Sequence, residues 1–477
     1  MNLSVGRASV HRVTLPRSAP DDQGLSGAAL DAFVAALDAS EQEIQTVMLL
    51  RDGHVVLEEE WSPYRLTDPH LLFSVSKSFT STAVGLAIEA GLLSLDDKVI
   101  SFFDDDELPA TISDNLAAMT VRHLLTMTTG HSEDTVEALS RDRRMVKIFL
   151  GLEVEHEPGT VFVYNSGATY MLSAILQRLT GEKLLDYLRP RLFEPLGITE
   201  ATWQVSREGI TVGGWGLSIN TESLAAFGQL LLQRGVWEGK QLVPAEWIEA
   251  ATSKQVPNDT QENPDWRQGY GFQFWRGRHN TYRGDGAFGQ FCLIFPEYDA
   301  ALIVTSATFD MQAVLDTVWD RLLPVLEGKE VEAVARPSSL ELPPPTGAAP
   351  GGGDGRTYRF AANDSGLVAA RLDPDGTGRF TFAHVVTGTG EPYEIVISAG
   401  QWQEHRRDSV VKDGVTVPGW RVLTSAYADG DAFVATVRFV ESPFVATFAC
   451  HPDGHQMTID VSLNVSFGPT EFTLTPE

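Results

Sequence analysis

Cysteine is almost absent from this chain. The sequence contains only Cys292 and Cys450, which lie far apart and form no Cys-x-x-Cys or Cys/His cluster. A disulfide framework and a structural zinc site are therefore excluded. We expect both residues to be reduced and buried thiols, as free cysteines usually are.

Long apolar runs and an excess of positive charge are also missing. No segment approaches the ~20 apolar residues of a membrane span, and residues 1–20 lack the apolar stretch of a signal peptide. Acidic residues number 64 against 36 Lys plus Arg, which gives a formal net charge of −28. Such a surface repels phosphate backbones and anionic lipids. We therefore expect a cytoplasmic protein whose partners include neither nucleic acid nor a membrane.

The composition is otherwise that of an ordinary globular protein. The chain has 477 residues, of which 43% are hydrophobic and 21% are charged. These values exclude a disordered or fibrous protein, and the length indicates two or three domains.

The first two thirds of the chain alternate helical patterns with short strands. Residues 45–60 predict a hairpin with its turn at Asp52-Gly53, and residues 290–307 predict two further strands. Residues 74–93 predict a helix that is apolar on all sides in its centre, which is typical of a buried helix. Strands at both ends with helices between them indicate an α+β domain whose terminal segments share one antiparallel sheet.

The last quarter of the chain has a different character. Residues 337–355 are rich in proline and glycine and predict a linker after a first domain at 1–336. Residues 356–477 contain short strand patterns separated by turns and almost no helical pattern. We expect an all-β C-terminal domain, an antiparallel β-barrel of lipocalin-like form, with a sandwich as the alternative.

Ser74 and Lys77 form a Ser-x-x-Lys pair at the start of the predicted buried helix. Positions i and i+3 share one helix face, so the amine can reach the hydroxyl. Serine needs a base to accept its proton, and burial at a helix N-terminus lowers a lysine pKa toward that task. A capped surface helix with a solvated lysine is the commoner origin of this spacing. A solvated lysine is out of place in so apolar a helix, so we predict that Ser74 is a nucleophile and Lys77 its base.

Two further segments carry candidate chemistry. Tyr164 precedes a predicted helix and could pass a proton to a leaving group, although a buried tyrosine with a satisfied hydroxyl is the alternative. Residues 282–290 (YRGDGAFGQ) contain three glycines, which imply a close approach of the backbone to another group. This segment is either a bulged strand edge or a strand whose N–H joins that of Ser74 in an oxyanion hole.

Several stretches together resemble the serine β-lactamase-like superfamily, in particular the class C β-lactamase-related esterases, D-aminopeptidases and amide hydrolases. They occur in the family's order, at 58–64 (EEEWSPY), 73–99 (FSVSKSFTSTAVGLAIEAGLLSLDDKV), 120–131 (TVRHLLTMTTGH), 157–176 (EPGTVFVYNSGATYMLSAIL), 213–232 (GGWGLSINTESLAAFGQLLL), 269–275 (GYGFQFW) and 286–297 (GAFGQFCLIFPE). The resemblance implies an antiparallel sheet flanked by helices, a helical subdomain, and an active site in the groove between them. It also implies that Ser74 is acylated, that Lys77 is the base and that Tyr164 relays the proton.

The family's Lys-Thr-Gly-like strand corresponds best to Gly284-Asp285-Gly286, although Tyr282-Arg283-Gly284 also fits loosely. The resemblance then implies that the N–H of Ala287 joins the oxyanion hole. Whereas the family has a Lys or His as the first residue of this motif, this chain has Gly284 there, and the acidic Asp285 follows. The negative charge of Asp285 disfavours a substrate carboxylate at this place.

Three other residues are candidates for substrate contact. Ser166 stands where the family's Tyr-x-Asn motif has an amide side chain, which weakens the case for recognition of peptide or β-lactam side chains. Tyr270 and Trp215 lie in family-like segments and are candidates for an apolar wall, with core packing as the alternative.

These residues together predict a serine hydrolase that acts through an acyl-enzyme on a small ester or amide, without metal or organic cofactor. One alternative is a D-amino-acid peptidase or β-lactamase/DD-peptidase activity. Another is a non-catalytic binding protein that retains the fold. The expected partner is a small-molecule substrate, and the sequence leaves a homo-oligomer open.

Overall fold

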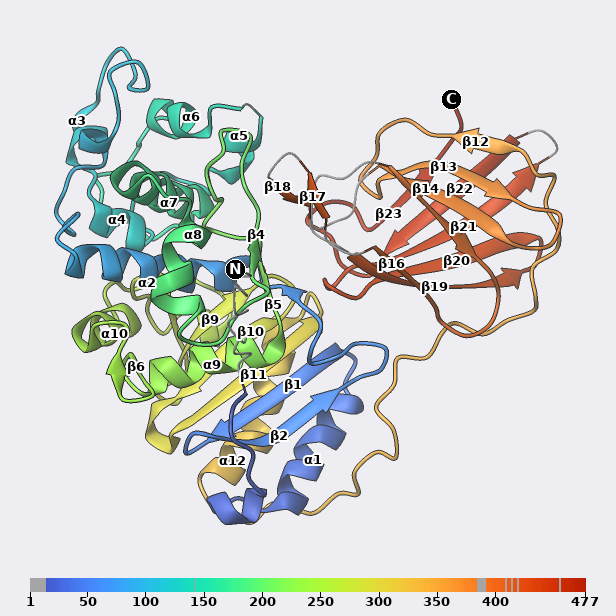
Figure 1. Ribbon diagram of the computed structural model, residues 1–477, viewed down its shortest axis with the longest axis horizontal. Coiled ribbons are helices and arrows are strands. Elements are labelled where there is room, and N and C mark those ends of the chain that lie inside the picture. Colours follow the sequence, from blue (N-terminus) through green and yellow to red (C-terminus); the bar gives the residue numbers. More distant parts are fainter. Residues whose placement is uncertain are drawn as a thin grey trace, which may run out of the picture.

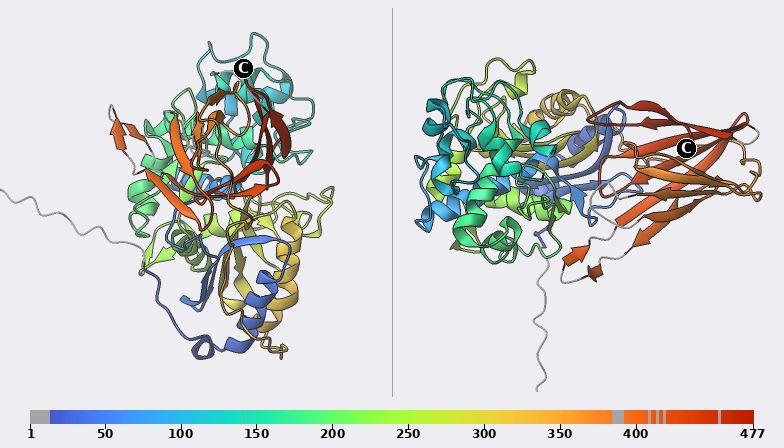
Figure 2. Two further views of the ribbon diagram at one scale, coloured as in Figure 1. Left: turned by 90° about the vertical axis from the view of Figure 1, so that its right-hand side faces the viewer. Right: turned by 90° about the horizontal axis from the view of Figure 1, so that it is seen from above.

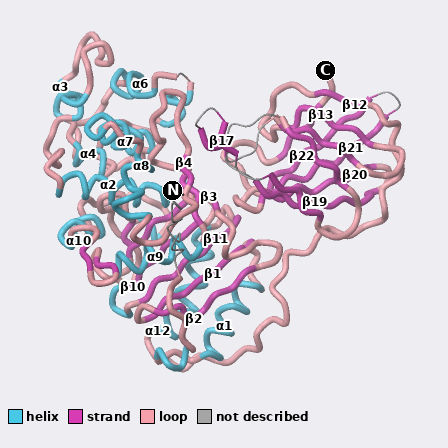
Figure 3. Tube along the Cα trace, in the orientation of Figure 1, coloured by secondary structure: helices cyan, strands magenta, loops and turns pink. Residues whose placement is uncertain are grey.

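The chain forms two lobes, shown in a computed structural model that describes residues 14–141, 143–383, 392–407, 410–412, 415–417, 420–453 and 456–477 (Figure 1). We call residues 14–326 the N-terminal lobe and the described residues from 357 onward the C-terminal lobe. Helices occur in the N-terminal lobe, whereas the described part of the C-terminal lobe contains strands and loops (Figure 3).

One six-stranded antiparallel sheet organises the N-terminal lobe. In spatial order its strands are β2 (His54–Glu60), β1 (Glu43–Arg51), β11 (Ala300–Ala307), β10 (Gln290–Phe295), β9 (Tyr282–Gly286) and β8 (Trp275–Arg276). The predicted hairpin and the predicted strand pair are both confirmed. Because β1 pairs with β11, the two ends of the lobe share one sheet, as the alternation of strands and helices predicts.

Helices cover both faces of this sheet, so its central strands are apolar on both sides. Met48 and Leu50 face the core that includes α2 (Ser76–Glu89) and α9 (Thr221–Leu232). Val47 and Leu49 face the opposite core. That second core is formed with α1 (Gly27–Asp38), α11 (Met311–Thr317), the π-helical segment η7 (Val318–Leu322) and α12 (Leu323–Leu326).

A helical subdomain is inserted between β2 and β8 (Figure 1). Its helices are α3 (Asp114–Ala118), α4 (Val121–Leu125), α5 (Val136–Ser140), α6 (Met145–Gly151), α7 (Ser166–Thr180) and α8 (Leu184–Leu188), continued by the π-helical η4 (Arg189–Phe193). The central helix α7 packs against α2, α4 and α6. Every helix in the described residues is too short or too polar to cross a lipid bilayer.

Smaller elements complete the N-terminal lobe. They are the 3-10 turns η1 (Pro20–Gln23), η2 (Phe73–Val75), η3 (Val99–Phe102), η5 (Pro264–Trp266) and η6 (Pro296–Tyr298), the helix α10 (Ala245–Thr252), the short sheet of β3 (His70–Leu71), β5 (Leu217–Ile219) and β4 (Thr202–Trp203), and the hairpin of β6 (Val236–Trp237) and β7 (Lys240–Gln241). The helix expected at 74–93 is therefore shorter than expected and begins at Ser76, after a 3-10 turn that contains Ser74.

The C-terminal lobe is all-β, as expected. One sheet contains β12 (Thr357–Arg359), β13 (Leu367–Leu372), β14 (Gly378–Phe382) and β15 (Tyr393–Ile397). A second contains β16 (Gln403–Arg407), β19 (Trp420–Asp429), β20 (Ala432–Phe439), β21 (Val445–Asp453), β22 (Gln456–Leu463) and β23 (Glu471–Leu474), beside a separate hairpin of β17 (Val410–Lys412) and β18 (Val415–Val417). The two larger sheets share one apolar core that includes Phe380, Phe382 and Phe448.

The expected barrel is not closed within the described residues. The two sheets remain separate, and backbone hydrogen bonds connect them at isolated points, from Ala426 N to Ser398 O (3.1 Å) and from Glu477 N to Arg359 O (3.0 Å). Closure needs a continuous ladder around the barrel, and isolated bonds at the corners do not supply one. The lobe is therefore a sandwich, the alternative that the strand pattern left open.

The two lobes lie side by side (Figure 2). Ion pairs and apolar contacts connect them. Arg421 Nη1 lies 2.6 Å from Asp68 Oδ2, and Arg438 Nη1 lies 2.6 Å from Glu43 Oε1. Both arginines are almost fully buried. The segment at 327–356 runs between the lobes without a helix or strand element. Both free cysteines are buried, as predicted.

Candidate active site

Ser74 and Lys77 meet at the N-terminal end of α2. Ser74 lies in the 3-10 turn η2 and Lys77 in the first turn of α2, and Lys77 Nζ lies 2.8 Å from Ser74 Oγ. The Lys77 side chain is only 1% exposed. The preceding residue, Phe73, has φ of 46°, a left-handed conformation that L-residues rarely adopt and that is often found at functional sites.

Two further acceptors hold the Lys77 amine. Nζ donates to Gly214 O at 2.8 Å and to Ser166 Oγ at 3.2 Å. A Cβ at position 214 would lie 3.0 Å from Ser166 O and 3.6 Å from Lys77 Nζ, so glycine allows this close approach. The sequence analysis missed Gly214 as a partner of Lys77, although the Gly213-Gly214 pair marks a place where backbone comes near another group.

Burial lowers the pKa of Lys77, as the sequence analysis predicts for a lysine at the start of a buried helix. Removal from water lowers the pKa of Lys77 to about 8, and the negative charges of Asp134 and Asp285 act in the opposite direction. Asp134 is held close by, since its Oδ1 accepts the Ser166 N–H at 2.8 Å. A neutral amine is therefore available to Lys77 near neutral pH.

Tyr164 lies directly beside the amine, just before α7. Lys77 Nζ is 4.7 Å from the centre of the Tyr164 ring. Burial and the charge of Asp285 raise the pKa of Tyr164, and hydrogen bonding to Ser74 and Trp275 lowers it. Because the shift is upward, the phenol keeps its proton and can donate it, which leaves Lys77 as the better base.

The amide side chain next to Tyr164 has a structural task. Asn165 Oδ1 accepts hydrogen bonds from Gly167 N (3.0 Å) and from Thr135 Oγ1 (2.8 Å), which caps α7. Ser166, one residue later, is the side chain that faces Lys77. Because Ser166 stands where the family's Tyr-x-Asn motif has an amide, a hydroxyl lies beside the Lys77 amine.

The end of β9 packs against the segment that carries the nucleophile. A Cβ at Gly286 would overlap the carbonyl oxygen of Leu72, two residues before Ser74. Ala287 follows in the turn between β9 and β10, and Gln290 Nε2 donates to its carbonyl at 3.2 Å. The end of the Gly284-Asp285-Gly286 stretch thus lies against Leu72, close in sequence to Ser74, as the assignment to the third motif expects.

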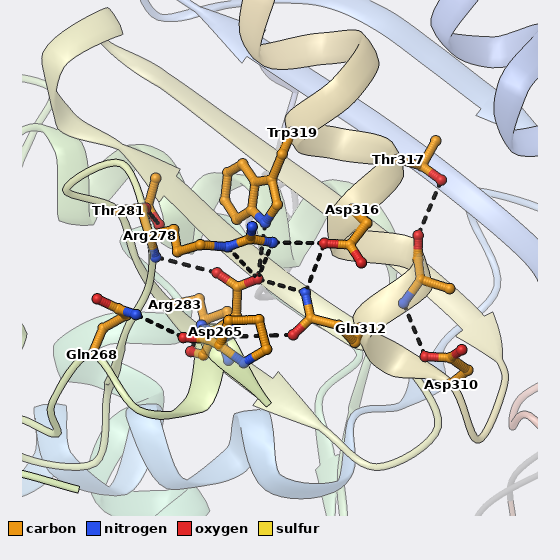
Figure 4. Close-up of polar contacts among 12 residues, drawn as sticks. Asp265, Gln268, Arg278, Thr281, Arg283, Asp310, Gln312, Asp316, Thr317 and Trp319 are labelled. Carbon is orange, nitrogen blue, oxygen red and sulfur yellow. Dashed lines mark hydrogen bonds and ion pairs between the residues drawn. The ribbon is translucent and has the colours of Figure 1, made fainter. Parts of the chain in front are cut away.

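Asp285 has a partner that the sequence analysis did not identify. Arg283, fully buried on the same strand face, donates from Nε to Asp285 Oδ2 at 2.9 Å. Its Nη1 also donates to the carbonyl of Asp265 (3.0 Å), which belongs to a polar network behind the strand (Figure 4). The sequence argument that Asp285 repels carboxylates treated it as an unpaired charge. The ion pair with Arg283 offsets part of the repulsion that an unpaired carboxylate would exert, so the argument is weakened.

Comparison with known proteins agrees with this geometry. The sequence profile of the family described as Beta-lactamase matches residues 17–326. This chain belongs to the beta-lactamase family. The match spans nearly the whole N-terminal lobe and includes Ser74, Lys77 and Tyr164.

The chain is also similar to individual proteins of known sequence or structure. A 6-aminohexanoate-dimer hydrolase of Paenarthrobacter ureafaciens is 26% identical over 306 residues, which are 58% of this chain and 77% of that protein. A lovastatin esterase of Penicillium rubens is 29% identical over 181 residues, 32% of this chain and 45% of that protein. The octameric penicillin-binding protein homologue of Pyrococcus abyssi aligns with 94% of this chain and 100% of its own, with a TM-score of 0.52 and 15% identity. That last likeness concerns the fold alone and extends over both lobes.

The two expected wall residues of this beta-lactamase family member differ in exposure. Trp215 is partly exposed next to Gly214, and its carbonyl accepts the Trp203 indole N–H at 2.7 Å. Tyr270 is buried, with its ring centre 6.2 Å from that of Tyr164 and 4.9 Å from that of Trp275. Trp215 is therefore the more accessible of the two, whereas Tyr270 is buried and packs near the Tyr164 ring. Trp275, whose ring centre is 5.1 Å from that of Tyr164, is a further aromatic neighbour of the site.

One acidic group with metal-ligand character exists in the described residues, away from the site. Its members, Asp104, Asp106 and Glu107, lie in a loop, and Asp104 and Glu107 pair with Arg178. The ion pairs fit the solvated acidic loop of an ordinary surface.

Proposed function

We propose that this beta-lactamase family member is a serine hydrolase that acts through an acyl-enzyme on small esters or amides. The observation that carries the proposal is the 2.8 Å contact between Ser74 Oγ and the buried amine of Lys77. A lysine whose pKa burial lowers to about 8 is suited to remove a proton near neutral pH. This arrangement also favours an enzyme over a binding protein that merely retains the fold.

The reaction follows from the contacts around Ser74. Neutral Lys77 accepts the hydroxyl proton while Ser74 Oγ bonds to the carbonyl carbon of the substrate. The N–H groups of Ser74 and Ala287 hold the oxyanion. Collapse of the tetrahedral intermediate breaks the bond to the leaving group, which takes a proton from the Tyr164/Lys77 pair. Water then repeats the sequence on the acyl-enzyme, releases the acid and restores Ser74.

The relatives support small amides and esters as the substrate class. One is a 6-aminohexanoate-dimer hydrolase, another a lovastatin esterase, and a third, from Brucella anthropi, is a D-aminopeptidase. Since Asp285 is paired with Arg283, its charge does not exclude substrates that carry a carboxylate. The D-amino-acid peptidase and β-lactamase alternatives therefore belong in the substrate screen. Cytoplasmic location and self-association remain predictions.

A fluorophosphonate probe tests the nucleophile directly. The wild-type protein should be labelled, and Ser74→Ala should lose both the label and turnover, by about 10⁴-fold or more. Ser76→Ala is the matched control, because Ser76 Oγ accepts the Leu217 N–H and lies outside the proposed chemistry. Labelling that persists in Ser74→Ala would overturn the proposal. A screen of p-nitrophenyl esters, D-amino-acid amides and nitrocefin then identifies the class, and nitrocefin turnover far above that of esters would reverse the order of preference.

A further inference from the structure

Five phenylalanine rings gather beside Ser74. We call Phe73, Phe288, Phe309, Phe444 and Phe467 the phenylalanine cluster. Ring centres lie 5.5 Å apart for Phe73 and Phe288, 4.8 Å for Phe288 and Phe467, and 5.9 Å for Phe73 and Phe444. The first three residues belong to the N-terminal lobe and the last two to the C-terminal lobe. Two parts of the chain that are far apart in sequence thus form one aromatic surface.

The cluster is attached to the backbone of the proposed oxyanion hole. Phe73 directly precedes Ser74, and Phe288 directly follows Ala287. Both phenylalanines have a positive φ, 46° for Phe73 and 66° for Phe288. Strained backbone of this kind persists where the surrounding structure demands it, often in ligand sites. Each side chain therefore starts within one residue of an N–H that is proposed to hold the oxyanion.

The C-terminal lobe presents its two rings on well-held turns. The turn between β20 and β21 carries Phe444, and its Glu441 carbonyl accepts the Leu71 N–H at 2.9 Å. The turn between β22 and β23 carries Phe467. Asn464 ties the two turns together, since its Nδ2 donates to Pro443 O (2.9 Å) and its Oδ1 accepts from the backbone of β21 (2.7 Å). These bonds tie the turn that carries Phe444 to Leu71, three residues before Ser74, and to the segment that leads to Phe467.

Part of the cluster is open to water. Phe467 is 77% exposed and Phe309 is 61% exposed, whereas Phe73 and Phe288 are buried beneath them. Isolated exposed apolar side chains are common, but a contiguous aromatic patch next to a nucleophile is typical of a binding surface. The patch has the chemistry to hold an apolar chain or an aromatic ring.

A second, separate aromatic group surrounds Tyr164. Phe162, Tyr164, Tyr270 and Trp275 contact one another, and the Lys77 amine lies over the Tyr164 ring. In the described residues, no ring contact connects this group to the phenylalanine cluster. Tyr164 and Lys77 deliver the proton to the leaving group, so the leaving group must lie on their side. The acyl group, bonded to the other side of the carbonyl carbon, then points away from them.

We propose that the phenylalanine cluster is the acyl-binding subsite, that it takes an apolar acyl chain or aryl acyl group, and that the C-terminal lobe completes it. This inference rests on the proposed serine hydrolase function and adds the acyl class to it. Catalysis needs the N-terminal lobe, whereas preference among acyl groups needs both lobes.

Matched substrate series test the proposal on the full chain. One series varies the acyl group from acetyl to butyryl to octanoyl and phenylacetyl, as p-nitrophenyl esters and as p-nitroanilides. A second keeps acetyl and lengthens the alcohol. We expect kcat/KM to rise with acyl length in both leaving-group classes, and Phe467→Ala to reduce octanoyl turnover about tenfold relative to acetyl turnover. Phe467→Leu should restore part of the preference. Ile112→Ala, an exposed apolar residue of the helical subdomain, is the control and should leave it unchanged.

The outcomes distinguish a failure of the acyl-binding subsite from a failure of the proposed serine hydrolase function. Ester turnover without acyl-length preference, preference that follows the alcohol instead, or an equal loss on all substrates in Phe467→Ala would overturn the subsite and leave the hydrolase. Absence of both fluorophosphonate labelling and ester turnover in the wild-type protein would overturn the hydrolase, and the subsite with it. Because Phe467 is mostly exposed, its replacement should leave the thermal melting curve unchanged.

Discussion

The Lys77 side and the phenylalanine side of Ser74 are held by different kinds of contact. On the Lys77 side, polar groups from η2, the start of α7 and the Gly214 segment converge on one buried amine. On the other side, aromatic rings from both lobes pack around Phe73 and Phe288. Polar contacts depend steeply on charge and geometry, whereas apolar contacts change gradually with buried area. The reaction and the choice of substrate are therefore expected to respond to different mutations.

Replacing Lys77, the proposed base, should have the largest effect on activity. Lys77→Met should lower kcat by about 10²–10⁴-fold, the usual contribution of general acid–base catalysis. Acetyl and octanoyl esters should lose the same factor, because the amine acts on the hydroxyl of Ser74 and not on the acyl chain. Steady-state kinetics on both esters measures this. Lys98→Met, which removes an exposed lysine bonded to Ala118 O, is the control. A retained activity within tenfold, or a loss confined to long chains, would contradict the assignment.

The interface between the lobes should give the next largest effect. Arg438→Met leaves Glu43 and Tyr64 without their buried partner, and removing one member of such a pair costs about 3 kcal/mol of unfolding free energy. Urea unfolding measures the loss. We also expect octanoyl turnover to fall more than acetyl turnover, because Phe444 and Phe467 belong to the loosened lobe.

A double variant makes the interface test specific. Glu43→Gln combined with Arg438→Met removes both charges, so it should be more stable than Arg438→Met alone. Equal instability of the single and double variants would show that the charge pair is not the cause.

A change in pH dependence is the smallest expected effect and concerns only the Lys77 side. Since only the neutral amine accepts a proton, kcat/KM should rise with pH and level off above about 8. The charge of Asp134 raises the pKa of Lys77, so Asp134→Asn should lower that pKa and move the rise to lower pH. The new amide keeps an oxygen for the Ser166 N–H. Glu133→Gln, at an exposed neighbouring carboxylate, should not move the profile. A shift of the Asp134→Asn profile toward higher pH would contradict the proposed effect of Asp134 on the pKa of Lys77.

Residues with local spacing constraints were predictable from the sequence. Ser74 and Lys77 are three positions apart at the start of an apolar helix, and the structure brings their side chains within hydrogen-bond distance. Tyr164 could be located through the resemblance, since its neighbours form a recognisable stretch. The α+β sheet followed from alternating strand and helix patterns, because burial on both faces forces apolar runs in β1, β10 and β11.

Other features became evident only in the folded chain. The Arg283–Asp285 pair weakened a charge argument: the two residues share one face of β9, but the sequence does not show that both are buried there against each other. The sequence did not show that Asn165, besides capping α7, also accepts a hydrogen bond from Thr135, 30 residues away. The C-terminal lobe resembled a barrel in its strand pattern, yet closure depends on how the edge strands meet.

The amino-acid sequence by itself determined the candidate reactive groups of this protein, since Ser74 and Lys77 are set by residue type and a spacing of three, and Tyr164 by the recognisable stretch around it. Only the tertiary structure decided what surrounds them. The acidity of Lys77 depends on burial by α7 and the Gly214 segment, and the aromatic surface beside Ser74 depends on rings from Phe73 to Phe467, nearly 400 residues apart. Such contacts arise when separate lobes pack, and packing is a property of the whole fold.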